Sequence, residues 1–139
     1  MIMTRKSDYA VRIFRALQDG RIHNVTEICE RENVPRAFAY KILRELEMNG
    51  LVKSERGNKG GYYLNVSLDE VTLFDIITTM EEDVSMLHCM REECDRNTSE
   101  HPCRIHTEIE RIQAIMEAEL QSRKISEILN GEAMEAAKG

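Results

Sequence analysis

Residues 35–66 read PRAFAYKILRELEMNGLVKSERGNKGGYYLNV in a chain of 139 residues. The first half is typical of a helix, because Pro35 suits a first turn and Asn49-Gly50 suits an end. Its apolar stripe consists of Phe38, Ile42, Leu43 and Leu46. The second half holds two short runs of strand-forming residues on either side of the glycine-rich segment 57–61, and this arrangement predicts a β-hairpin.

Upstream of this stretch the sequence predicts two more helices. Apolar residues recur at helical spacing from Ser7 to Gln18, and Gly20 ends the pattern. A shorter helix, capped by Asn24, is expected to end near Asn33. Helix, short helix, helix and hairpin is the order of a winged helix-turn-helix, in which the hairpin is the wing. We therefore expect a mainly α fold with a small β-hairpin wing (α+β).

In such a fold the third helix presents the N-terminal half of its exposed side to the major groove of DNA. The candidates there are Arg36, Ala37, Tyr40, Lys41 and Arg44, and the wing adds Arg56, Asn58 and Lys59 for phosphate or minor-groove contacts. The net charge is −6, but residues 1–61 carry twelve Lys/Arg and eight Asp/Glu, whereas the rest carries seven and seventeen. Only the first part is therefore expected to meet phosphates.

Downstream of the hairpin the sequence divides into three further parts. Residues 68–80 predict a helix, capped by Asp69 or Thr72, that completes a DNA-binding domain over residues 1–80. A loop over residues 81–103 follows, and then a long helix within residues 104–130, before a frayed tail at 131–139. The long helix carries a narrow apolar seam of Ile105, Ile109, Ile112, Met116 and Leu120. Such a seam requires a partner, and we expect a homodimer joined through this C-terminal helix.

Three of the four cysteines lie within the predicted loop. Cys89, Cys94 and Cys103 occupy fifteen residues, whereas Cys29 falls on the apolar side of the second helix and is expected in the core. Clustered thiolates are ligands for soft metal centres such as iron–sulfur clusters. Two other uses remain open: a zinc site completed by His88, His101 or His106, and a thiol pair that reports redox state by forming a disulfide.

Other classes of protein are disfavoured by the sequence. No apolar run approaches the ~20 residues needed to cross a bilayer, and the N-terminal residues lack the pattern of a secretory signal. We therefore expect a cytoplasmic protein, where cysteines serve metal or redox chemistry more often than structural disulfides. The only glycine-rich stretch lies between strands, not before a helix, so neither an enzyme nor a small-molecule substrate is predicted.

The fold-deciding stretch resembles one family in particular. The residues Tyr40–Leu46, Asn49–Ser54 and Arg56–Leu64 closely resemble the recognition helix and wing of the Rrf2 family, the bacterial winged-helix regulators that include IscR and NsrR. Ser7–Arg12 is similar to that family's first helix. The three loop cysteines fall where cluster-binding members keep theirs, and the resemblance covers roughly residues 1 to 125.

This resemblance implies a homodimeric transcription factor, expected to be a repressor, with one iron–sulfur cluster per subunit held by three cysteines and one other ligand. Two residues match a precedent for that ligand. His106 follows Cys103 at the C-x-x-H spacing of IscR-like proteins, which hold a 2Fe-2S centre. Asp8 stands where NsrR-like proteins place an aspartate that reaches the partner's 4Fe-4S centre. The expected signals are iron or cluster supply, redox state and nitric oxide; the alternative is a cluster-free regulator that responds to a partner protein or small molecule.

Overall fold

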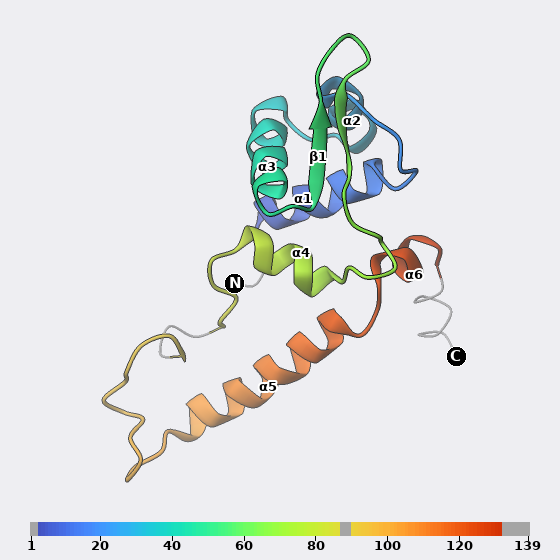
Figure 1. The fold of residues 1–139 in the computed structure, drawn as a ribbon. Coiled ribbons are helices and arrows are strands. Elements are labelled where there is room, and N and C mark those ends of the chain that lie inside the picture. Colours follow the sequence, from blue (N-terminus) through green and yellow to red (C-terminus); the bar gives the residue numbers. More distant parts are fainter. Residues whose placement is uncertain (1–2, 87–89, 132–139) are drawn as a thin grey trace.

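The computed structural model describes residues 3–86 and 90–131. Six helices and one hairpin follow each other in the described chain (Figure 1). In order they are α1 (Arg5–Ala16), α2 (Val25–Glu32), α3 (Arg36–Met48), β1 (Val52–Glu55), β2 (Gly61–Leu64), α4 (Leu73–Met80), α5 (Arg104–Gln121) and α6 (Ile125–Leu129). The prediction of a mainly helical fold with a two-stranded antiparallel wing is confirmed.

One hydrophobic core joins α1, α2, α3 and α4. The apolar stripes that the sequence predicts meet there, because 3.6-residue periodicity places every third or fourth side chain on the same side of a helix. The fully buried members include Ile13, Phe14, Leu17, Ile28, Ile42, Leu43, Leu46 and Ile76. This core holds α3 against α1 and leaves the opposite side of α3 exposed to solvent.

The fourth helix begins at Leu73, after Thr72, which is the later of the two caps that the sequence predicts. Thr72 and Asp75 form a reciprocal capping box, with hydrogen bonds of 2.9 and 3.2 Å, that fixes this start. The residues before it serve another purpose, because the carbonyls of Leu68 and Val71 accept hydrogen bonds from the chain at the start of α6. Their backbone is therefore unavailable for a helical turn.

The predicted C-terminal segment 104–130 consists of two helices with different roles. Helix α5 runs away from the winged domain, whereas α6 folds back beside the start of α4 (Figure 1). Ile125 at the start of α6 is 3% exposed and belongs to the main core. The seam predicted for dimerisation thus lies on α5 alone. Within the described residues, no helix is both long and apolar enough to span a bilayer.

Candidate nucleic-acid interface and cysteine loop

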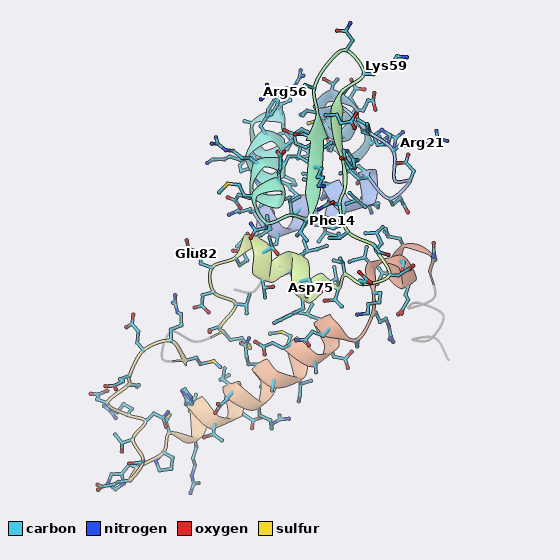
Figure 2. All side chains as sticks on the ribbon, in the orientation of Figure 1. Phe14, Arg21, Arg56, Lys59, Asp75 and Glu82 are labelled. Carbon is cyan, nitrogen blue, oxygen red and sulfur yellow. The ribbon has the colours of Figure 1, made fainter. Side chains whose placement is uncertain are left out.

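The wing is a regular hairpin whose tip carries the predicted basic residues. Strands β1 and β2 pair antiparallel with Val52 opposite Leu64 and Glu55 opposite Gly61. The turn is closed by a hydrogen bond from the Gly60 N–H to the Gly57 carbonyl, 3.0 Å. Figure 2 shows Arg56 and Lys59 projecting from opposite sides of the tip. Arg56, Asn58 and Lys59 are all exposed, as a DNA-contacting wing requires.

A third segment pairs with the wing, which the sequence does not predict. The His23 N–H donates to the Tyr62 carbonyl at 2.9 Å, and the Tyr62 N–H donates back at 2.8 Å. This bridge explains the second of the paired glycines, since a Cβ at Gly61 would lie 2.3 Å from the His23 carbonyl oxygen. In the sequence, the paired glycines 60 and 61 are the one signal that could have indicated this close approach of another segment to β2.

The side chain of His23 fixes this third segment in place. His23 is 6% exposed and lies between two carboxylates, 2.8 Å from Glu27 Oε2 and 2.9 Å from Asp19 Oδ2. Burial disfavours the imidazolium, but the hydrogen bonds to Glu27 and Asp19 outweigh it and raise the pKa of His23. The His23 ring therefore links the α1–α2 loop to the first turn of α2 through its contacts with Asp19 and Glu27.

This raised pKa predicts that the folded protein loses stability as the pH rises. His23 binds its proton more tightly in the folded chain than at its ordinary pKa of 6.5. The resulting stabilisation is complete below that value and disappears as the pH rises through the folded-state pKa. We expect the melting temperature to fall as the pH rises above 6.5, and His23→Gln to weaken this dependence. If the melting temperature of the variant fell equally with pH, the assignment of this pH dependence to His23 would be contradicted.

The recognition helix α3 exposes every residue predicted to face DNA. Its buried side consists of Ala39, Ile42, Leu43 and Leu46, and its exposed side includes Arg36, Ala37, Tyr40, Lys41 and Arg44. Arg36 donates a 2.7 Å hydrogen bond to Thr26 Oγ1 on α2, which orients its guanidinium. Lys41 and Arg44 form no ion pair with any described residue and are available to an anionic partner.

Phe38 is a correction to the predicted apolar stripe of this helix. Its side chain is 43% exposed, and its ring meets the edge of Tyr9 at a centroid distance of 5.5 Å. The next residue, Ala39, is fully buried instead. Phe38 therefore adds an apolar group to the exposed surface of the recognition helix.

The cysteine loop presents two thiols within the described residues. Cys94 and Cys103 are half-buried and form no disulfide. Cys103 caps α5: its Sγ accepts the His106 N–H at 3.5 Å, and its own N–H donates to Asn97 Oδ1 at 2.9 Å. Cys89 and His88 lie outside the described residues.

The loop is tied to the body of the protein at its beginning. Gln113, the single buried residue of α5, accepts the Met86 N–H at 2.9 Å and donates to the Val84 carbonyl at 3.1 Å. Glu81 accepts hydrogen bonds from the hydroxyls of Thr4 and Ser7 at the start of α1, with Ser7 Oγ at 2.6 Å. Burial opposes the charge of Glu81, but these bonds lower its pKa. The sequence does not single out Gln113 or Glu81 as positioning residues.

The two candidates for a fourth ligand occupy different places. His106 lies one turn into α5, directly after the capping Cys103, with a side chain 15% exposed. Asp8 lies on α1 and pairs with Arg12 at 3.1 Å. Among residues 3–86 and 90–131, no three metal-binding side chains converge on one point. The thiols of Cys94 and Cys103 are nevertheless the kind of soft donor that iron–sulfur centres require.

Comparison with known proteins agrees with this arrangement. A family model described as an iron-dependent transcriptional regulator, Rrf2, matches residues 3–131. The regulator IscR of Pectobacterium carotovorum is 33% identical over 101 residues, which cover 68% of this chain and 60% of IscR. Protein aau3 of Rhizobium meliloti is 34% identical over 91 residues, covering 64% of this chain and 59% of aau3. The chain thus spans about three fifths of each relative.

Solved structures share the fold across almost the whole chain. CymR, the global cysteine regulator of B. subtilis, superposes with a TM-score of 0.75 at 22% identity, covering 94% of this chain and 97% of CymR. IscR of T. potens gives a TM-score of 0.71 at 23% identity, covering 98% and 90%. The family match, the winged fold and the exposed basic recognition helix lead to one conclusion. The chain belongs to the Rrf2 family, whose model is described as that of an iron-dependent transcriptional regulator.

Proposed function

We propose that this chain is a homodimeric regulator whose binding to an operator is controlled by an iron–sulfur cluster at Cys89, Cys94 and Cys103. The observation that carries the proposal is the position of the cysteine loop. Its first residue, Glu81, is hydrogen-bonded to the start of α1, and its last, Cys103, caps α5. A change at the thiols thereby acts on one helix of the DNA-binding domain and on the helix that carries the apolar seam.

The ligand set follows from chemistry and from the family. Three thiolates supply the soft donors, and either His106 of the same chain or the partner subunit's Asp8 completes the set. An imidazole or carboxylate binds iron less firmly than a thiolate, so one iron of the cluster has a ligand that exchanges easily. When bound, the cluster supplies a centre sensitive to iron supply, redox state or nitric oxide. His106 implies a 2Fe-2S centre and Asp8 a 4Fe-4S centre.

The proposed dimer uses the seam on α5. Ile105, the first residue of the seam, is 70% exposed in the single chain, and the other seam residues are half-buried, so apolar surface remains for a second copy. Two-fold symmetry then sets two α3 helices at a fixed separation for a palindromic operator. Because half-sites one helical turn apart demand that separation, small movements of α5 or α1 change the affinity steeply.

At the DNA, the N-terminal half of α3 enters the major groove and the wing tip meets the flanking backbone. Arg36 and Arg44 are suited to guanine or phosphate, whereas Lys41 and Tyr40 are suited to phosphate. Arg56, Asn58 and Lys59 bind at the wing, and Ala37 allows close approach of the helix. A regulator of this kind acts in the cytoplasm, where we propose that it represses its operator.

Metal analysis of protein purified without oxygen tests the proposed cofactor. Iron and acid-labile sulfide in equal amounts are expected in each subunit, because the thiol donors suit a cluster better than a single ion. Mössbauer spectra then separate a two-iron centre, which favours His106, from a four-iron centre, which favours Asp8. Zinc alone, or no metal, would replace this mechanism with a zinc or thiol regulator, or with one that responds to a partner protein or small molecule.

A further inference from the structure

The α1–α2 loop carries a basic residue beside the wing that none of the preceding assignments use. Arg21 stands two residues before His23, whose backbone pairs with Tyr62 on β2. Its side chain is exposed and projects outward on the side of the hairpin away from α3 (Figure 2). The loop therefore widens the wing into a three-segment surface, and Arg21 lies at its outer edge.

The backbone around Arg21 is held by specific interactions. The Arg21 N–H donates to Asp19 Oδ1 at 2.9 Å, and the Asp19 carboxylate also binds the buried His23 ring. Gly61 permits the close approach of strand β2 to the α1–α2 loop, as described above. The backbone that carries Arg21 is thus held in place by hydrogen bonds, which reduces the entropy lost when this segment binds a partner.

The charges around Arg21 leave its guanidinium available. Three arginines on the neighbouring helices are occupied by carboxylates: Arg12 by Asp8, Arg15 by Glu32 and Arg31 by Asp19. Arg21 forms no ion pair with any residue that the structure describes. The nearby carboxylates of Asp19 and Glu27 are themselves engaged by His23, with Arg31 adding a second cation at 3.9 Å from Asp19.

We propose that Arg21 binds the DNA phosphate backbone beyond the wing, so that each subunit meets DNA through α3, the wing tip and the α1–α2 loop. The inference rests on the proposed DNA interface and extends it by one element. Arg21 and the wing-tip residue Lys59 lie on the same side of the hairpin, away from α3, whereas Arg56 lies on the α3 side (Figure 2). A duplex whose major groove receives α3 continues past the hairpin on this side, and the next phosphates face Arg21.

The test is the salt dependence of binding to a fluorescein-labelled duplex of random sequence, because phosphate contacts dominate such binding. Each contact contributes about 0.9 to the slope of log affinity against log salt concentration. Arg21→Ala is expected to reduce this slope by about one per bound subunit, and Arg21→Lys to retain it. Arg44→Ala on α3 is a positive comparator that reduces the slope in the same assay.

Arg5→Ala is the matched control for the loss of one exposed arginine. Arg5 begins α1, which starts beside α4 at the end of the domain away from the wing tip (Figure 1), so its removal leaves the slope unchanged. Thermal melting of Arg21→Ala is expected to match that of the wild type. If Arg44→Ala lowers the slope and Arg21→Ala does not, this inference is overturned and the interface stands. If wild-type binding showed no salt dependence, both the Arg21 proposal and the proposed DNA interface would be overturned.

Discussion

Replacing Cys94 and Cys103 together with serine is expected to remove iron and sulfide from the purified protein. A neutral hydroxyl does not replace a thiolate as a ligand of an iron–sulfur centre, and Cys103 is held in place by Asn97 and the His106 N–H. We expect iron to fall from about one cluster per subunit to background. Operator affinity should then be the same before and after treatment with a chelator.

Cys29→Ser is the matched control for this double variant. Cys29 lies half-buried on α2 against the core, and burial raises the pKa of its thiol. Such a thiol is a poor metal ligand at neutral pH, so the control retains its iron. Circular dichroism establishes that both variants are folded. Iron retained in the double variant at the wild-type level would refute the proposed ligands.

Gly61→Ala is expected to destabilise the fold strongly by separating the wing from the α1–α2 loop. The added Cβ lies 2.3 Å from the carbonyl oxygen of His23 and 2.8 Å from the Asn24 nitrogen, both of which are backbone atoms. Relief requires the hairpin to separate from the α1–α2 loop, which breaks the pair of hydrogen bonds between His23 and Tyr62. We expect a loss of about 2–4 kcal/mol in the free energy of unfolding.

Gly20→Ala separates this clash from the general cost of removing a glycine. Gly20 lies in the same loop at φ +75°, and a Cβ there meets no atom within 4 Å. Only backbone strain remains, which costs on the order of 1 kcal/mol. Chemical denaturation measures both variants, and Gly61→Ala should also bind DNA more weakly because its wing is displaced. Equal losses in the two variants would show that the close approach at Gly61 is unimportant.

Local patterns in the sequence were sufficient for most of the fold. The stripes of α1 and α3 follow helical periodicity, and the Asn24 cap and the Gly57–Gly61 turn mark boundaries that short-range chemistry determines. The exposed positions of Lys41 and Arg44 follow from the same periodicity. The separation of α3 into a buried and an exposed side was therefore predictable without tertiary information.

Tertiary contacts account for what the sequence did not reveal. The sequence left the cap of α4 open between Asp69 and Thr72, and the structure has Thr72, where the carbonyls of Leu68 and Val71 bind the chain near Ile125, more than fifty residues later. The bridge between His23 and Tyr62 similarly joins segments that no local pattern connects. Phe38 is exposed while its neighbour Ala39 is buried, and the ring of Phe38 packs against Tyr9 of α1, a contact between two helices. Whether His106 or the partner subunit's Asp8 is a ligand depends on how two subunits pack together. A pattern in the sequence of one chain does not determine that packing.

Operator affinity measured with and without the cluster tests the central claim most directly. The operator is first selected from a random DNA pool with protein prepared without oxygen, and affinity is then measured for iron-loaded and chelator-stripped samples. Cluster control through Glu81, α1 and α5 predicts a clear difference between the two samples in the wild type and in Cys29→Ser, and none in the Cys94/Cys103 double variant. The same affinity in loaded and stripped wild-type protein would contradict the proposal that the cysteine loop governs DNA binding.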